Sequence, residues 1–264
     1  MEDGFFESVK NAGVNRISLG MQSATESERK KLGRFADKEK IKRTIEAAKE
    51  AGIYNISLDV MLGIPEQTIE SLDETIDFCI DSGVPHISAY MLSIEEGTHF
   101  HKIQHKLSLP GEDTVCKMYL HLSKRLVAAG YCHYEISNFA KNGHESRHNL
   151  KYWQCEEYLG LGPSAHSFIL GKRFYFPRDT ESFINGEGAV FDCLGGDFEE
   201  YVMLRLRLGD GIDLSEIEKI YKRPFPLDRA LKYIDMGLVS QNGNSLALTT
   251  EGFLMSNTII SDIL

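Results

Sequence analysis

The feature that most constrains the fold is a regular alternation of helix and strand patterns in the first third of the chain. Residues 15–21, 53–62 and 86–93 are predicted strands, and residues 2–12, 39–51 and 68–82 are predicted helices. Ile41, Ile45 and Ala48 recur at helical spacing, and Gly13 and Gly52 end two of the helices. Such alternation is typical of parallel strands joined by crossover helices, so we expect an α/β fold.

The pattern changes after residue 93, where a long helix over 112–129 is followed by a polar and irregular stretch over 134–151. A strand is expected over 172–177. Helices are then predicted over 199–208, 214–221, 227–236 and 250–264. Asn242-Gly243 lies between two apolar runs, which indicates a β-hairpin. We therefore expect three parts, 1–110, 111–196 and 197–264, the last a small winged-helix-like α+β domain.

Charge and cysteine content narrow the function classes. The net charge is −10, and residues 197–264 carry seven Lys/Arg against eleven Asp/Glu, so we expect no nucleic-acid partner. No apolar run approaches the roughly 20 residues that span a bilayer, and the first residues do not resemble a secretory signal. The five cysteines include no CxxC or CxxxC pair, which favours a reducing cytoplasm and predicts no metal site.

Polar residues at the predicted strand ends are the candidate site. Gln22, Asp59 and Ser93 lie at or near the carboxyl ends of successive strands, where barrels of parallel strands place their active sites. Asp59 lies within an apolar strand, where an unpaired carboxylate is costly, so it needs a partner. Two interpretations stay open at this point: a structural ion pair with Arg34, or a ligand site.

Several long motifs resemble one known family. GVNRISLGMQS at 13–23, LGR at 32–34, NISLDVMLGIPEQT at 55–68 and HISAYMLSIEEGT at 86–98 resemble the oxygen-independent coproporphyrinogen III oxidase family of radical S-adenosylmethionine (SAM) proteins. The stretches 134–153 and 158–167 are more specific. Their HNxxYW pattern, at His148, Asn149, Tyr152 and Trp153, resembles the HemW-type branch, the heme chaperones.

The resemblance implies both a fold and a set of ligands. The fold is the C-terminal half of a partial (β/α)6 radical SAM barrel followed by the winged-helix-like domain. Gln22, Arg34, Asp59 and Ser93 would bind SAM. His148 would bind heme, with hydrogen bonding to a loop as the alternative role. The family also carries a [4Fe–4S] cluster on CxxxCxxC, a motif that this sequence does not contain.

Two functions follow from the resemblance. The first is a heme-binding chaperone that delivers heme to recipient proteins. The alternative is an oxidase-like oxidoreductase of porphyrin and heme biosynthesis, inactive as this chain because radical cleavage of SAM needs the cluster. We predict no catalytic residue for this chain alone. The strand at 15–21 would leave an open barrel edge, which predicts a dimer through that edge. His101 and His105, spaced i, i+4, are expected on a solvated helix face.

Overall fold

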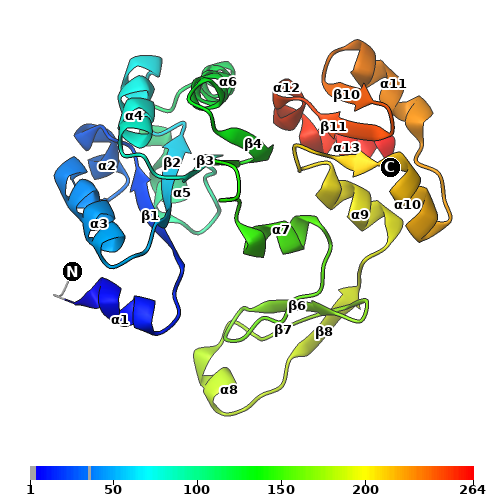
Figure 1. The fold of residues 1–264 in the computed structure, drawn as a ribbon, viewed down its shortest axis with the longest axis horizontal. Helices are drawn as coiled ribbons and strands as arrows, with labels where there is room; N and C mark the ends of the chain where they lie inside the picture. Colours follow the sequence, from blue (N-terminus) through cyan, green and yellow to red (C-terminus); the bar gives the residue numbers. More distant parts are fainter. Residues whose placement is uncertain (1–3, 35–36) are drawn as a thin grey trace. The chain divides into compact units, whose positions relative to one another are not determined.

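The computed structural model describes residues 4–34 and 37–264. The chain divides into two compact units, Met1–Glu145 and Ser146–Leu264 (Figure 1). The boundary falls inside the stretch 111–196 that the sequence suggests as a connecting region. No helix in the described part of the chain is long and apolar enough to cross a membrane.

The first unit is built on a five-stranded sheet of order β1-β2-β3-β5-β4. Its strands are β1 (Arg16–Gln22), β2 (Asn55–Leu62), β3 (His86–Met91), β4 (Cys132–Glu135) and β5 (Asn138–Ala140). β1, β2 and β3 are parallel, as the alternating pattern predicts, and β5 and β4 continue the sheet in antiparallel pairing. The mixed α/β class with a parallel sheet is therefore confirmed.

Six α-helices of the described residues accompany this sheet: α1 (Phe5–Asn11), α2 (Glu26–Lys31), α3 (Lys38–Glu50), α4 (Ile69–Asp81), α5 (His99–Ile103) and α6 (Glu112–Ala128). Figure 1 shows the parallel strands in the middle of the unit with α3, α4 and α6 around them. Side chains cap three of these helices, α3, α4 and α5. The Asp37 carboxylate accepts the Lys40 N–H, and Thr68 and Ser71 form a capping box that starts α4.

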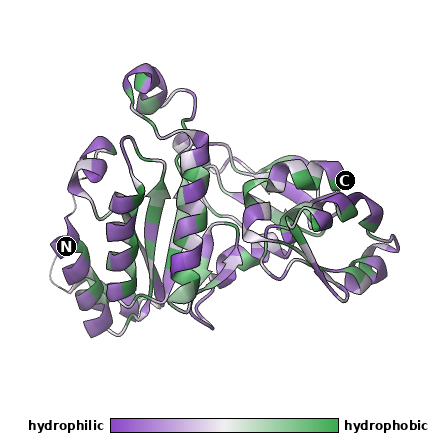
Figure 2. Cartoon of the chain, turned by 90° about the horizontal axis from the view of Figure 1, so that it is seen from above, coloured by the Kyte–Doolittle hydropathy of each residue, from purple (hydrophilic) through white to green (hydrophobic). Residues whose placement is uncertain are grey.

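One face of the sheet forms the core of this unit. Ile56, Leu58, Val60 and Leu62 alternate along β2 and are fully buried, with α4 and α6 packed on that strand. The residues between them in the strand are mostly polar and point to the opposite face. In Figure 2 the hydrophobic colour accordingly lies along the strands, and the hydrophilic colour lies on the outward sides of the helices.

The second unit holds two small antiparallel sheets, of order β6-β7-β8 and β10-β11-β9. Its strands are β6 (His166–Ile169), β7 (Lys172–Tyr175), β8 (Val190–Leu194), β9 (Ile212–Asp213), β10 (Val239–Asn242) and β11 (Ser245–Leu248). Its helices are α7 (Arg147–Trp153), α8 (Thr180–Ile184), α9 (Phe198–Arg205), α10 (Leu214–Tyr221), α11 (Leu227–Asp235), α12 (Thr250–Leu254) and α13 (Ser256–Ile263). β10 and β11 form the predicted hairpin, with Asn242 paired to Ser245.

Two sequence predictions of local structure are wrong. The stretch 134–151 contains β5, most of α7 and the end of β4 rather than irregular chain. These strands have three or four residues, too few to show a period, and they form because β3 offers β5 a partner. The single helix predicted over 250–264 is two helices, because the backbone leaves helical geometry at Met255, where φ is −111°.

Candidate functional site

The face of the sheet opposite the core is polar and follows the strand register. Arg16 lies beside Asn55, and its Nη1 donates to the Asn55 Oδ1 at 3.3 Å. One pair further along, the Ser57 hydroxyl lies 2.8 Å from His86 Nδ1. Asp59 is the next polar residue of β2 on this face. This face of the sheet thus carries a row of polar side chains that leads to the carboxyl ends of its parallel strands.

Asp59 lies in the middle of this row. The Ser18 hydroxyl donates to its Oδ1 at 2.7 Å. Burial raises the pKa of the carboxyl group, while hydrogen bonds from Ser18 and Ser88 and the charge of Arg16 oppose the rise. The ion pair with Arg34, one of the two interpretations of the sequence, is not seen within the described ranges 4–34 and 37–264. Asp59 therefore contacts its own sheet rather than the loop that carries Arg34.

Gln22 ends β1 in an unusual backbone conformation. The pairing of β1 with β2 shifts between Gly20 and Gln22, and Gln22 has a φ of 66°, in the left-handed region that few non-glycine residues adopt. Its side chain is 6% exposed, and the Tyr90 hydroxyl donates to its Oε1 at 3.1 Å. Such backbone strain persists only where neighbouring contacts hold it.

A buried hydrogen-bond network next to Gln22 provides those contacts. The Ser23 hydroxyl donates to the Glu28 Oε2 at 2.6 Å, and the Gln67 Nε2 donates to the same oxygen at 3.3 Å. The Gln67 Oε1 in turn accepts the Gly63 N–H at 2.7 Å. The network joins the chain after β1 to the loop after β2. Sequence reasoning missed Glu28, because the charged helix ESERKK has no apolar period to reveal a buried face.

Arg34 and Ser93 line one open cavity of about 760 Å³. Its basic side chains come from the end of α2, from Arg34 and from α5, and its apolar ones include Leu92 and Phe100. The Ser93 hydroxyl donates to the Glu95 Oε1 at 2.6 Å. The structure thus brings two of the four predicted SAM residues into one cavity, while Gln22 and Asp59 belong to the polar face of the sheet.

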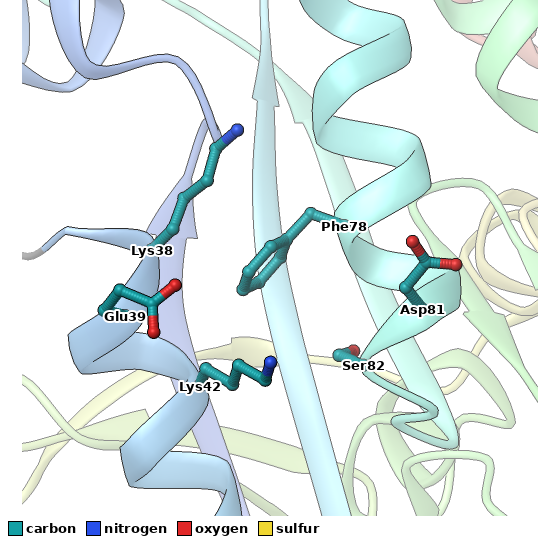
Figure 3. A pocket seen from close by; sticks show the side chains of 6 residues that line it. All are labelled: Lys38, Glu39, Lys42, Phe78, Asp81 and Ser82. Carbon is teal, nitrogen blue, oxygen red and sulfur yellow. The ribbon is translucent and has the colours of Figure 1, made fainter.

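A second cavity, of about 240 Å³, lies between α3 and α4 (Figure 3). Phe78 and Asp81 from α4 and Ser82 just after it face Lys38, Glu39 and Lys42 from α3. The Lys38 ammonium also lies 3.6 Å from the Glu74 carboxylate. This cavity has mixed charge and contains none of the predicted site residues.

His148 lies on α7 in the second unit, with an exposed side chain. Its Nε2 is 2.7 Å from the Tyr152 hydroxyl one helical turn away. The Tyr152 ring packs edge-on against Tyr158, with centroids 4.5 Å apart, and Arg207 lies over the Trp153 ring at 5.9 Å. The HNxxYW pattern therefore forms an aromatic cluster that holds an accessible imidazole.

In the part of the chain that the structure describes, the remaining histidines and the cysteines form no metal centre. His101 lies in α5 and is half-buried, and His105 lies in the short 3-10 turn that follows and is exposed. His166 is exposed and stacks on Tyr175 at 5.3 Å. Over residues 4–34 and 37–264, no three His, Cys, Asp or Glu side chains gather where they could hold a metal ion, and none of the five cysteines is in a disulfide. The cysteines present therefore do not fit a [4Fe–4S] cluster, which needs at least three neighbouring thiolates.

Family models and curated relatives match most of the chain. A family model of the Radical SAM superfamily matches residues 1–79, and a model of the HemN C-terminal domain matches residues 197–255. The heme chaperone HemW of Bacillus subtilis is 34% identical, covering 97% of this chain and 71% of the relative. That of Lactococcus lactis is 31% identical, covering 100% of this chain and 73% of the relative.

A solved structure supports the fold. The structure of coproporphyrinogen III oxidase (HemN) from Escherichia coli, a radical SAM enzyme, superposes with a TM-score of 0.82 at 19% identity. It matches 100% of this chain and 67% of its own. The radical SAM match covers the strands that carry Gln22 and Asp59, and the identity to the HemW relatives extends over nearly the whole chain. The chain therefore belongs to the HemW family of radical SAM proteins.

Proposed function

We propose that this protein binds heme and delivers it to recipient proteins. The observation that carries this proposal is the accessible imidazole of His148, held by Tyr152 within an aromatic cluster. Imidazole is a common axial ligand of heme iron, and aromatic side chains suit a flat apolar macrocycle. The relatives with this family membership are named heme chaperones, which agrees with the proposal.

The contact between His148 and Tyr152 defines how the imidazole would bind iron. For Nδ1 to coordinate the metal, Nε2 must carry the ring proton and donate it to the Tyr152 oxygen, 2.7 Å away. A hydrogen bond on the second nitrogen fixes the tautomer and the orientation of a metal-binding imidazole. Heme is the cargo in this proposal, and Tyr152 orients its ligand.

We further propose that Gln22, Arg34, Asp59 and Ser93 bind SAM. Arg34 offers a guanidinium for the ligand carboxylate, and the Asp59 carboxylate accepts hydrogen bonds from hydroxyl or amino groups. Gln22 offers an amide held in place by Tyr90. Bound SAM would supply an adenosyl group and a sulfonium centre. No radical step is assigned to this chain, since its cysteines do not fit the cluster that provides the electron.

The finer architecture belongs to the same proposal. We regard β1 to β3 with their helices as the second half of a six-stranded partial barrel, and residues 197–264 as a winged-helix-like domain that meets a protein partner. The parts would be 1–110, 111–196 and 197–264. Within the described residues β1 pairs on one side with β2, so its other edge could join a second copy in a dimer. The expected location is the cytoplasm.

We expect His148→Ala to weaken heme binding by roughly tenfold to a hundredfold, because the axial ligand is lost. The measurement is a heme titration followed by the absorption spectrum of the bound heme. His166→Ala is the matched control, since His166 is also an exposed histidine of the second unit. Equal affinity of the His148 variant and the wild type would rule out His148 as the ligand.

We expect Asp59→Asn to weaken SAM binding by roughly tenfold or more, because the change removes the charge that strengthens its hydrogen bonds to the ligand. Equilibrium dialysis with radiolabelled SAM measures this. Asp81→Asn is the control, an exposed carboxylate at the far end of α4 in the same unit. If both variants bind SAM like the wild type, Asp59 does not belong to a SAM site.

A further inference from the structure

A chain of hydrogen bonds runs across the sheet from Tyr134 to Asp59. The Tyr134 hydroxyl lies 2.9 Å from His86 Nε2, and His86 Nδ1 lies 2.8 Å from the Ser57 hydroxyl. The Ser57 and Ser88 hydroxyls are 3.4 Å apart, and Ser88 is the residue of β3 that pairs with Asp59, whose pKa a hydrogen bond from Ser88 helps to lower. These side-chain contacts therefore connect β4, β3 and β2, and the Tyr134 side chain reaches His86 past β5.

The protonation state of His86 determines the direction of the hydrogen bonds in this series. Its side chain is 0% exposed, and burial lowers the pKa of the imidazole to about 3, with the charges of Arg16 and His144 acting in the same direction. The ring is thus neutral at pH 7. A neutral imidazole donates through one nitrogen and accepts through the other. A proton placed on Nδ1 or on Nε2 therefore sets which way every hydroxyl in the chain points.

With Asp59 ionised, counting protons backwards along the hydrogen bonds leaves one arrangement. An ionised Asp59 can only accept hydrogen bonds, so the Ser88 hydroxyl donates its one hydrogen bond to the carboxylate. Ser57 must then donate to Ser88, and it needs a proton from His86 Nδ1–H. His86 Nε2 is left as an acceptor for the Tyr134 hydroxyl.

We propose that His86 and Tyr134 are positioning residues for Asp59, acting through Ser57 and Ser88. When the hydrogen bonds are aligned in this way, the Ser88 hydroxyl donates to the Asp59 carboxylate. With the Ser18 hydroxyl on Oδ1, the carboxylate is then held in one orientation, and its remaining lone pairs face the ligand. Aligned hydrogen bonds polarise one another, so the loss of the Tyr134 hydroxyl weakens the hydrogen bond from Ser88 to Asp59. The proposal rests on the SAM-binding role proposed above for Asp59.

The first test observes the His86 tautomer by NMR of the chain labelled with 15N-histidine. The resonances are assigned from the signal that disappears in His86→Gln. We expect Nδ1 to carry the proton in the wild type. In Asp59→Asn the new amide can donate a hydrogen bond to Ser88. The hydrogen bonds between this amide and Tyr134 then reverse direction, and the His86 ring proton moves to Nε2. A wild-type proton on Nε2, or a tautomer that does not respond to Asp59→Asn, overturns the proposal whatever the ligand.

The second test measures SAM binding by equilibrium dialysis. Tyr134→Phe removes one hydroxyl and should weaken binding about threefold to tenfold. Tyr131→Phe is a matched control, because the buried Tyr131 hydroxyl donates to the Val84 carbonyl outside the chain of hydrogen bonds. The control should bind SAM like the wild type. Circular dichroism confirms that both variants are folded.

The outcomes distinguish the SAM-binding role of Asp59 from the positioning role of His86 and Tyr134. If Asp59→Asn binds SAM like the wild type, the proposed SAM site is wrong. If Asp59→Asn weakens binding and Tyr134→Phe does not, or if Tyr131→Phe weakens it equally, the positioning role is wrong and the SAM site stands. Weaker binding of Tyr134→Phe, with an unaffected Tyr131→Phe, supports the positioning role.

Discussion

Gly211→Ala is expected to lower the free energy of unfolding of the second unit by about 3–5 kcal/mol. Gly211 has a φ of +64°, and an added Cβ would lie 2.1 Å from the Leu246 carbonyl oxygen and 2.7 Å from Ala247 Cα. Both of these neighbours are backbone atoms, which cannot rotate away as the end of a side chain could. Ile212, the next residue, pairs with Leu246 in the sheet, so relief of the clash would break that pairing.

Urea unfolding followed by tryptophan fluorescence measures this loss, because Trp153 is the single tryptophan of the chain and lies in the second unit. Gly237→Ala is the control. Gly237 also has a positive φ, +72°, but an added Cβ there would meet nothing within 4 Å. The control should lose only about 1–2 kcal/mol, the cost of left-handed backbone alone. Equal losses in the two variants would show that the contact with Leu246 has no effect.

Glu135→Gln is expected to stabilise the first unit increasingly as the pH rises. Glu135 is 1% exposed, and burial raises the pKa of its carboxyl group to about 7, against the opposing hydrogen bonds of Asn138 and the Ser137 backbone. The folded protein therefore holds this proton more tightly than the unfolded chain, whose Glu pKa is near 4.5. Stability is highest below that value and falls as the pH rises through about 7. Glutamine keeps the shape without the charge.

The advantage of Glu135→Gln over the wild type should grow by about 2–3 kcal/mol between pH 5 and pH 8. Urea unfolding followed by circular dichroism at both pH values measures it. Burial lowers the pKa of His86 and His133, which costs stability as the pH falls, but both proteins share this effect and the difference cancels it. The exposed Glu112→Gln is the control. An advantage that does not change with pH would mean that Glu135 is not protonated in the folded state.

The parallel sheet could be predicted because its signals are local. Apolar residues at helical spacing, such as Ile41 and Ile45, reveal a helix within one segment, and the alternation of segments then favours parallel strands. Asn242-Gly243 predicts its hairpin for the same reason, since the turn chemistry lies in two adjacent residues. Asp59 was noticed because a carboxylate within an apolar strand is costly wherever that strand is placed.

The partners of these residues were decided by the tertiary structure. The position of Arg34 in the loop after the first strand suggested it as the partner of Asp59, whereas the strand register places Ser18 and Ser88 there. The short strand β5 exists because β3 offers it an edge, since three residues carry no readable period.

The polar networks likewise depend on residues that are far apart in the sequence. His86 bonds to residues 29 and 48 positions away in the sequence, and Glu28 bonds to Gln67 39 positions away. The sequence alone determined the alternation of helices and strands in the first third of the chain and the family resemblance, because both are carried by contiguous residues. Only the folded sheet decided which polar groups meet, because hydrogen bonds between distant residues have no period along the chain and depend on strand order and register.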